Sequence, residues 1–420
     1  MLCVKGGLCY IDGTFVNADI LIDGGKIAKV ARDIGEDLTG EEVIDAENCL
    51  VIPSFFNSHT HAAMTLLRCV VEDRPLMEWL REVWKIEGRM SDSDVYAGTR
   101  LAILEMIKTG CGCFSDQYFH MDAVARAVEE SGVRAVLGYG MIDMGDEEKR
   151  EKELREARKF IEGWKDRCDR IGLSVDPHSP YTCSEELIRE SLKLAEEYSL
   201  PVHIHVAETE WEVNEILNKK GMRPVEYLDS LNVFRERTII AHGVWLSDGE
   251  IELLAKKGVS VAHCPVSNLK LGSGIARVAD LLKAGVNVCL GTDGAASNNS
   301  LNMLEEMKFA VLLQKIRSGV DSISTGDFLR MATENGYKAY GIKGGRIETG
   351  YLADIAILEK SFSYTPLYNP VYSIVYSSCG FEVRDLIVNG EVVMRNRDVL
   401  TMDEEEVIDE AERRGFNLVL

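Results

Sequence analysis

The stretch LVIPSFFNSHTH, residues 50–61, joins an apolar run to two histidines that lie two positions apart. An apolar run of this length is consistent with a buried strand. Because side chains alternate along a strand, His59 and His61 project from the same face, and a strand that ends here presents both at its carboxyl end. Two such imidazoles are spaced to grip one divalent ion, although two core histidines would give the same pattern. The other histidines decide between these interpretations.

Most of the eight histidines close a short apolar run. Three of these runs cover residues 202–206, 238–242 and 259–263. Between them lie amphipathic stretches of helical period, such as residues 185–197 and 248–257. Alternation of strand and helix predicts βαβ units that share a parallel sheet.

The predicted strands end near eight positions, which are His61, Asp116, Gly140, Pro177, His205, His242, His263 and Asp293. Eight βα units over this length predict a closed (β/α)8 barrel, whose chemistry lies at the carboxyl ends of its strands. A doubly wound open sheet is the competing fold, and a G-x-G-x-x-G turn after a strand would favour it. No such turn follows any predicted strand, so the barrel is preferred.

Polar side chains at these strand ends converge on one cavity of the predicted barrel. His59, His61, His205 and His242 come from three strands, and Asp293 comes from the last. Imidazoles and a carboxylate together make a site suited to zinc, with iron or manganese as weaker fits. Any one of these residues could be a satisfied core histidine or a loop cap. Five at the correct ends of one barrel favour a metal site.

Several motifs beyond the histidines carry a family resemblance. These motifs occupy residues 57–61, 75–80, 177–184, 205–209, 267–274 and 291–299. With them, the chain resembles the 5′-methylthioadenosine/S-adenosylhomocysteine deaminase family, in the nucleobase-deaminase and chlorohydrolase branch of the amidohydrolase superfamily. The resemblance covers nearly the whole chain. It implies hydrolytic deamination of 5′-methylthioadenosine, 5′-deoxyadenosine, adenosine or S-adenosylhomocysteine to the inosine analogue and ammonia.

The resemblance also implies which residues bind the metal. It places one divalent ion, zinc or alternatively iron(II), on His59, His61, His205 and Asp293. A lysine that could be carbamylated is missing at the end of the fourth strand, where residues 176–178 read Asp-Pro-His. A bridged two-metal site is therefore not expected.

Catalytic and substrate-binding roles follow from the same resemblance. Glu208 matches the proton shuttle that faces the base, and His242 matches a residue beside the attacking water. Glu87 matches the carboxylate that grips the ribose hydroxyls, and His178 lines the substrate pocket. The chemistry needs such groups, because attack at C6 pushes electrons onto N1, which must then receive a proton. Asp293 can accept the proton of the water.

One departure from the family concerns the 5′ end of the substrate. Relatives that accept S-adenosylhomocysteine hold its carboxylate with arginines after the third strand, where Tyr139 stands here. Arg150 could supply one contact or could belong to a solvated charged helix, and both interpretations stay open. With at most one cation there, we expect uncharged 5′ groups to be preferred.

The surplus sequence lies at both ends of the barrel. Residues 1–52 and 345–400 show short alternating strands and turns, and we expect them to pair into one composite β-sandwich. Residues 53–344 form the predicted catalytic barrel. Residues 401–420 read as a charged amphipathic helix.

Composition limits the remaining possibilities. The net charge of −22 argues against a nucleic-acid surface, and no apolar run reaches the length of a membrane span. Of the eleven cysteines, Cys111, Cys113, Cys264 and Cys289 fit small core residues in a reducing cytoplasm. The expected partners are a nucleoside substrate and further copies of the chain, as a dimer or tetramer. Rival hypotheses are a deaminase or chlorohydrolase of the same branch with a guanine, oxidised purine, cytosine or triazine substrate, and a non-catalytic scaffold.

Overall fold

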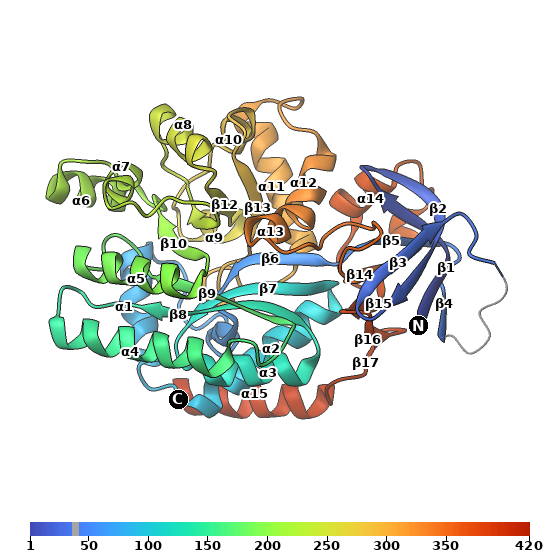
Figure 1. Ribbon diagram of the computed structural model, residues 1–420, viewed down its shortest axis with the longest axis horizontal. Helices are drawn as coiled ribbons and strands as arrows, with labels where there is room; N and C mark the ends of the chain where they lie inside the picture. Colours follow the sequence, from blue (N-terminus) through green and yellow to red (C-terminus); the bar gives the residue numbers. More distant parts are fainter. Residues whose placement is uncertain (36–41) are drawn as a thin grey trace.

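Eight parallel strands form the central sheet of the computed structural model, which describes residues 1–35 and 42–420 (Figure 1). In chain order they are β6 (Phe55–Thr60), β7 (Cys111–Tyr118), β8 (Arg134–Met141), β9 (Ile171–Pro177), β10 (Val202–Val206), β11 (Thr238–His242), β12 (Ser260–His263) and β13 (Asn287–Leu290). Each strand pairs in parallel with the next one along the chain. The predicted (β/α)8 barrel is confirmed, and its strands end within three residues of the predicted positions.

The segment after β13 closes the barrel against β6. The backbone N–H of Asp293 donates to the carbonyl of His59 at 2.9 Å. The side chain of Asn57 accepts from the backbone N–H of Thr292 at 2.9 Å and donates to its hydroxyl at 2.7 Å. A Cβ atom at Gly291 would lie 2.7 Å from the backbone nitrogen of His59, so only glycine permits this approach.

Helices cover the outside of the barrel (Figure 1). They are α1 (Leu76–Glu87), α2 (Asp92–Lys108), α3 (Met121–Ser131), α4 (Glu147–Trp164), α5 (Glu185–Tyr198), α6 (Glu210–Lys220), α7 (Pro224–Ser230), α8 (Asp248–Lys257), α9 (Pro265–Lys270), α10 (Val278–Lys283), α11 (Met303–Ser318), α12 (Thr325–Met331) and α13 (Glu334–Ala339), with the 3-10 turn η1 (Ala62–Leu67). The amphipathic stretches seen in the sequence become α5 and α8. Both begin at a serine cap, where the hydroxyl of Ser184 or Ser247 accepts a hydrogen bond from an otherwise unpaired backbone N–H.

Both ends of the chain build a second, separate sheet beside the barrel (Figure 1). Its strands are β1 (Leu2–Ile11), β2 (Thr14–Asp23), β3 (Lys26–Ala31), β4 (Glu42–Asp45), β5 (Cys49–Pro53), β14 (Ile355–Glu359), β15 (Val383–Val388), β16 (Glu391–Arg395) and β17 (Asp398–Val399). The antiparallel pair of β5 and β14 joins the two halves, and the sheet has an apolar core of its own. The later elements η2 (Phe362–Tyr364), α14 (Pro370–Ser377) and α15 (Glu404–Val419) complete the chain. Among the described residues, no helix combines the length and apolarity that a bilayer crossing requires.

The amino end of the barrel is filled by aromatic side chains. Phe56 stacks on Tyr340 with ring centroids 5.6 Å apart and meets Tyr337 edge-on at 5.0 Å. Both tyrosines belong to α13 or directly follow it, and they pack with small and β-branched residues inside the barrel. This floor leaves the carboxyl end of the barrel for the site.

Candidate active site

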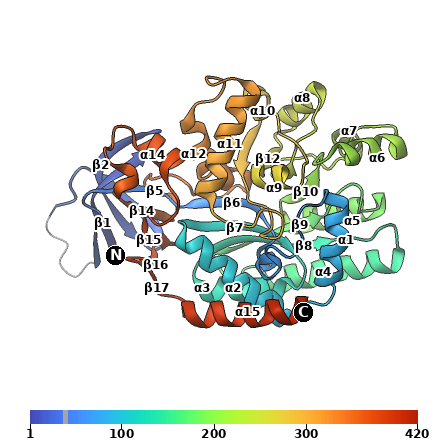
Figure 2. The ribbon, with the colours of Figure 1, turned by 180° about the vertical axis from the view of Figure 1, so that it is seen from behind.

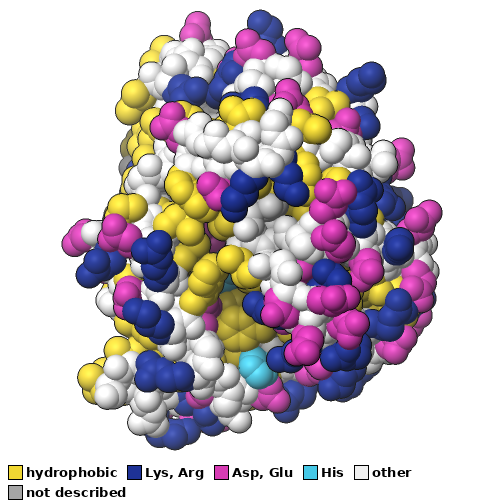
Figure 3. Space-filling model, turned by 90° about the vertical axis from the view of Figure 1, so that its left-hand side faces the viewer, with side chains coloured by type: hydrophobic (Ala, Val, Ile, Leu, Met, Phe, Trp, Pro, Cys, Tyr) yellow, Lys and Arg dark blue, Asp and Glu magenta, His cyan; other side chains and the backbone are white. Residues whose placement is uncertain are grey.

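A cavity lies at the carboxyl ends of the barrel strands. Figure 3 looks onto this side of the molecule, where apolar side chains surround a hollow and charges of both signs lie around it. The lining includes His61, Glu87, His178, His205, Glu208, His242 and Asp293. His59 lies fully buried beside them, and Arg150 is not among the lining residues. Eight of the nine residues singled out in the sequence therefore lie in or beside one cavity.

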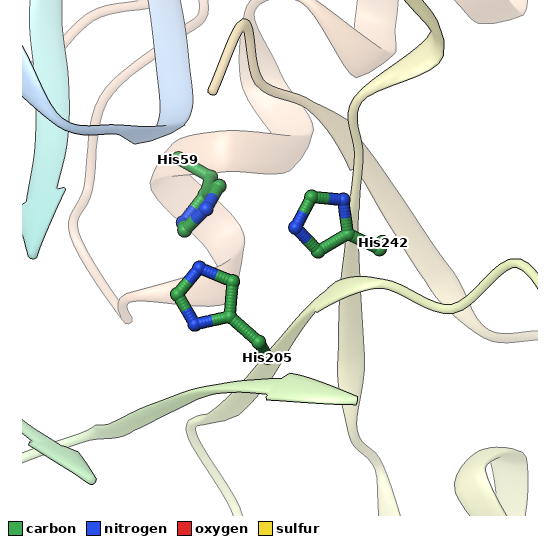
Figure 4. Close-up of side chains that lie close together, drawn as sticks. All are labelled: His59, His205 and His242. Carbon is green, nitrogen blue, oxygen red and sulfur yellow. The ribbon is translucent and has the colours of Figure 1, made fainter. Parts of the chain in front are cut away.

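The histidines and the aspartate are close enough to share one ion. Potential ligand atoms of His59, His205 and His242 all lie within 4.8 Å of one another, and the same holds for His59, His61 and Asp293. Figure 4 shows the three rings of the first group turned toward a common point. The Nε2 atoms of His61 and His59 lie 3.2 and 3.7 Å from Asp293 Oδ1. This donor set of imidazoles and one carboxylate fits a divalent transition metal.

Backbone carbonyls hold two of these rings in place. The Nδ1 atom of His61 lies 2.6 Å from the carbonyl oxygen of Gln117, and that of His205 lies 2.8 Å from the carbonyl oxygen of His178. An Nδ1–H that donates to a carbonyl leaves the Nε2 lone pair free, which is the state that binds a metal. The Nε2 atom of His59 is buried without a hydrogen-bond partner among the described residues, which also fits a ligand atom.

A chain of buried hydrogen bonds orients His59 from the floor of the barrel. Its Nδ1 lies 3.1 Å from Nε2 of His203, and Nδ1 of His203 lies 2.8 Å from the hydroxyl of Tyr340. Tyr340 in turn donates to Ser115 at 2.6 Å. One tautomer satisfies every link: His59 donates to His203, and His203 donates to Tyr340. We call this the His203–Tyr340 chain.

The sequence did not reveal the role of His203, although a signal was present. His203 lies two residues before His205 on β10, so both side chains point into the barrel. Tyr340 gave no signal at all, because its hydroxyl meets His203 only through the packing of α13 against the floor.

Hydroxyls and backbone amides fix the carboxylate of Asp293. Its Oδ2 accepts from Ser267 at 2.6 Å and from Ser297 at 2.9 Å, and its Oδ1 accepts from the backbone N–H of Gly294 at 2.8 Å. Burial by itself would raise the pKa of Asp293, but the hydrogen bond and the charge of His61, when that ring is protonated, hold the pKa of Asp293 well below its usual range. A metal ion bound in place of that proton would act in the same direction. Asp293 is therefore an anion that is ready to bind a cation.

Glu208 follows β10 and is 5% exposed. Its Oε2 lies 3.8 Å from Nε2 of His242, and its Oε1 accepts from Ser273 at 3.3 Å. Nδ1 of His242 lies 2.9 Å from the side-chain oxygen of Asn268, which fixes that ring. Burial raises the pKa of Glu208, and the neighbouring His242 opposes this only in part. A carboxyl of this kind can hold a proton closer to neutral pH than an exposed one.

Three non-glycine residues at the site have left-handed backbone angles. Ala207, His242 and Asp293 have φ values of 53°, 72° and 63°, and each lies at or just after the end of a barrel strand. Such angles cost free energy and occur most often where function fixes a side chain. The strain turns the chain so that strand-end residues face the cavity.

Glu87 reaches the cavity from α1 and is 5% exposed. The hydroxyl of Tyr118 donates to its Oε1 at 2.5 Å, which leaves Oε2 for another partner. Burial raises the pKa of Glu87, and this hydrogen bond lowers it again in part. Like His203 and Tyr340, Tyr118 is a residue whose role the sequence did not reveal.

A larger cavity of about 720 Å³ adjoins the first. The two share Trp84, Glu87, Phe119 and Ile142 in their linings, and the larger one also includes Lys149, Lys152 and Lys159 of α4. These lysines recur at intervals of three and seven residues and therefore share one helix face.

Arg150 points away from that face. Its guanidinium lies 3.5 Å from Glu147, one turn earlier on α4, and it lines neither cavity. In the larger cavity, lysines of α4 stand beside carboxylates, and Arg150 is not part of its lining.

Comparison with known proteins agrees with this geometry. The model of the amidohydrolase family matches residues 50–393. The chain belongs to this family. A 5-methylthioadenosine/S-adenosylhomocysteine deaminase 2 from Archaeoglobus fulgidus is 48% identical to this amidohydrolase over 100% of the chain and 99% of its own length. A 5′-deoxyadenosine deaminase from Methanothermobacter thermautotrophicus is 47% identical over 97% of the chain and 96% of its own length.

The solved structures extend the comparison to a metal-loaded relative. An adenosine deaminase from Xanthomonas campestris, crystallised with bound zinc, superposes on this amidohydrolase with a TM-score of 0.94. It is 30% identical, and the match covers 99% of this chain and 98% of that one.

Proposed function

We propose that this amidohydrolase is a metal-dependent hydrolytic deaminase of adenosine-type nucleosides, which yields the inosine analogue and ammonia. The observation that carries the proposal is one cavity that joins the metal-donor cluster to a buried carboxyl at Glu208 and to Glu87. Two relatives of nearly equal length are named as deaminases of such nucleosides. The proposed substrates are 5′-methylthioadenosine, 5′-deoxyadenosine, adenosine and S-adenosylhomocysteine.

His59, His61, His205 and Asp293 would hold one divalent ion, for which we propose zinc, with iron(II) as the alternative. The free Nε2 of His59 and the zinc in the solved relative support this assignment. Bound there, the ion supplies a Lewis acid that lowers the pKa of water to about 7. His242 is close enough to be a further ligand, but we assign it to the reacting oxygen.

The side chains move the protons of the reaction. Asp293 accepts a proton from the water while the water oxygen forms a bond to C6 of the purine, and the displaced electron pair moves to N1. Glu208, whose pKa is raised by burial, donates its proton to N1. The C6–nitrogen bond then breaks as the C6=O bond forms. The leaving amine takes the proton held by Asp293 and departs as ammonia, and the proton of the C6 hydroxyl passes to Glu208, which restores both residues. Positioned proton transfers of this kind contribute about 10²–10⁴-fold to the rate.

Glu87 is placed to bind the ribose. Its Oε1 is already occupied by Tyr118, so the carboxylate is held in one orientation for the ribose hydroxyls. Charge-assisted hydrogen bonds contribute about 1.5–3 kcal/mol each. Free adenine and 2′-deoxynucleosides are therefore expected to be poor substrates.

The adjoining cavity would take the 5′ substituent. Its lining combines three lysines of α4, Lys149, Lys152 and Lys159, with the carboxylates of Glu87, Asp92, Asp122 and Glu156. The cavity as a whole is therefore not cationic, but one of these lysines could pair with the carboxylate of S-adenosylhomocysteine. The preference for uncharged 5′ groups that the sequence suggested loses its reason, because it rested on a single cation. We now expect S-adenosylhomocysteine to be turned over with a kcat/KM similar to that of 5′-methylthioadenosine.

The test is ammonia release from a panel of nucleosides, measured as kcat/KM on the metal-loaded enzyme. Turnover of the four proposed substrates, with little from free adenine, guanine or a triazine, supports the proposal. Lys152→Ala should lower kcat/KM for S-adenosylhomocysteine alone, and Arg150→Ala on the other face of α4 is the matched control. No ammonia from any adenosine derivative would contradict the proposed function.

We also propose a cytoplasmic location. Cys9, Cys111 and Cys113 are among the cysteines that form no disulfide and are packed in buried strands. Free buried thiols in this number fit a reducing compartment. Fractionation of cells that express the chain from its own gene would check the location.

A further inference from the structure

Glu212 is a buried carboxylate that the proposed reaction does not use. It is the third residue of α6 and is 1% exposed. Figure 2 shows α6 beside α7, on the side of the barrel where the strands end. A carboxylate removed from water is tolerated only where it finds hydrogen-bond donors in the protein. The donors that Glu212 meets therefore indicate what it does.

Both carboxylate oxygens of Glu212 accept from the short turn that joins β10 to α6. Its Oε1 accepts from the backbone N–H of Ala207 at 2.8 Å, and its Oε2 accepts from the backbone N–H of Glu208 at 2.9 Å. Glu212 thus holds the backbone of the proposed proton shuttle itself. Two bonds from one rigid carboxylate fix the orientation of two consecutive peptide groups.

The next βα unit contains an ordinary helix start, which shows what differs at Glu212. Ser247 caps α8, and Glu250, the third residue of that helix, accepts from the backbone N–H of Ser247 at 2.9 Å. This reciprocal arrangement is a capping box. The cap of α6 is Thr209, but the carboxylate of Glu212 passes it and binds the two residues before it. Glu212 therefore fixes the chain that leads into the helix rather than the first turn of the helix.

The turn that Glu212 holds is one that needs support. Ala207 has a φ of 53°, which is unfavourable for a residue with a Cβ atom and persists only where the surroundings fix it. On its other side, the carbonyl of Ala207 accepts from the backbone N–H groups of Val244 and Trp245 at 3.0 and 2.9 Å. Loss of the Glu212 contacts would leave the turn held from one side only, and the side chain of Glu208 would move with it.

We propose that Glu212 is a positioning residue that holds the carboxyl of Glu208 in place for proton transfer. The inference rests on the proposed function, in which Glu208 donates a proton to the purine. The ligand residue His205 has support of its own, because its Nδ1 and its backbone nitrogen lie 2.8 and 3.0 Å from the carbonyl oxygen of His178. Glu212 therefore acts on proton transfer and not on metal binding.

The first experiment replaces Glu212 in the metal-loaded enzyme. Glu212→Gln keeps the size of the side chain but turns one acceptor into a donor, which then faces a backbone N–H. For the nucleoside with the highest kcat/KM, kcat should fall about 10–100-fold, while KM and metal content should change less than about threefold.

Glu250→Gln is the matched control for this variant. Glu250 is also 1% exposed and also binds backbone N–H groups, but those of Ser247 and Val225. Its replacement should lower the stability against urea and leave kcat within about threefold of the wild type.

A double-variant cycle tests whether Glu212 acts through Glu208. In a Glu208→Gln enzyme the shuttled proton is gone, so the addition of Glu212→Gln should lower kcat by less than about threefold more. If Glu212 supported only the fold as a whole, the two losses would multiply.

A further measurement follows the two backbone amides and needs no turnover. Hydrogen exchange, read by mass spectrometry on peptides that span Ala207 and Glu208, should show both amides protected in the wild type. In Glu212→Gln they should exchange at least about 10-fold faster. The wild-type part of this measurement stands even if Glu212→Gln does not fold.

Four results would overturn the proposal. The first is fast exchange of these two amides in the wild type, and the second is a Glu212→Gln enzyme with near-normal kcat. The third is an equal loss of kcat in Glu250→Gln, and the fourth is multiplied losses in the cycle. A wild type that releases no ammonia would instead contradict the proposed function, and hydrogen exchange would then decide alone whether Glu212 holds the turn.

Discussion

The two ends of the barrel are built from the same eight strands but carry opposite chemistry. At the carboxyl end of the strands, which we call the mouth, His205, His242 and Asp293 surround a cavity. Two of these three residues have left-handed backbone angles. At the floor, Phe56 and Tyr337 pack edge to face with no cavity between them. The mouth therefore bears the strain and the buried charge, and the floor supplies the packing that holds them. The His203–Tyr340 chain is a direct link between the two ends.

The largest effect should come from the metal ligands at the mouth. His205→Ala removes a proposed ligand atom, so both the amount of bound metal and turnover should fall. The loss should be far greater than the about 10–100-fold loss of metal affinity or activity that follows when a residue hydrogen-bonded to a ligand is replaced. Metal content by mass spectrometry and ammonia release on the same sample check this. His263→Asn is the control, because His263 ends β12 but lies outside the donor cluster. A His205→Ala enzyme with full metal would remove His205 from the ligand set.

The next prediction distinguishes a role of Glu208 in proton transfer from a role in metal binding. Glu208→Gln keeps the size of the side chain but cannot donate a proton, so kcat should fall about 10²–10⁴-fold while the metal is retained. Glu210→Gln, at an exposed position in the first turn of α6, should behave like the wild type. Near-normal turnover by Glu208→Gln would exclude it as the shuttle.

A smaller loss of metal affinity should follow from a substitution at the amino end of the barrel, which is the floor. Tyr340→Phe removes the hydroxyl that accepts from His203, so His59 is less firmly held, and metal affinity should fall about 10–100-fold. The measurement is competition with a chelator, followed by metal content. Tyr337→Phe is the matched control, because its hydroxyl donates to Asp354 instead and should change stability without changing metal affinity. Equal losses in the two variants would mean that the floor acts only through packing.

The smallest effect concerns the pH dependence of stability near the mouth. Burial raises the pKa of Glu306 from its ordinary 4.5 to about 8, although the Val266 amide and the Asn298 side chain donate to it. The folded state thus keeps a proton that the unfolded state releases above about 4.5. The free energy of unfolding should therefore fall as pH rises from about 4.5 to about 8, by up to about 1.4 kcal/mol per unit from this group. Glu306→Gln should reduce the pH dependence of the free energy of unfolding, and Glu305→Gln should not. Denaturant titrations at several pH values measure this slope.

Much of the barrel could be predicted from local sequence. The apolar runs, their strand-end histidines and the helical stretches between them have fixed periods, so the eight strand ends were placed within three residues. The donor cluster followed from the rule that all parallel strands of a barrel open at one end. His59, His61 and Asp293 needed no knowledge of packing, because each lies within three residues of the end of a strand.

Other features depend on contacts between distant parts of the chain. Tyr340 and Tyr118 gave no local signal, because their hydroxyls find His203 and Glu87 only after α13 and α1 have packed. The place of Arg150 stayed open in the sequence for a related reason: one step along a helix turns a side chain by about 100°, so lysines of α4 line the cavity and Arg150 does not.

The sequence by itself determined the fold class, the donor residues at the strand ends and the place of Glu208, since these depend on periodicity and on spacing within short segments. The tertiary structure decided which atoms support those donor residues and which side chains of α4 line the adjoining cavity. Such features arise from side chains far apart in the chain, whose distances no local pattern encodes.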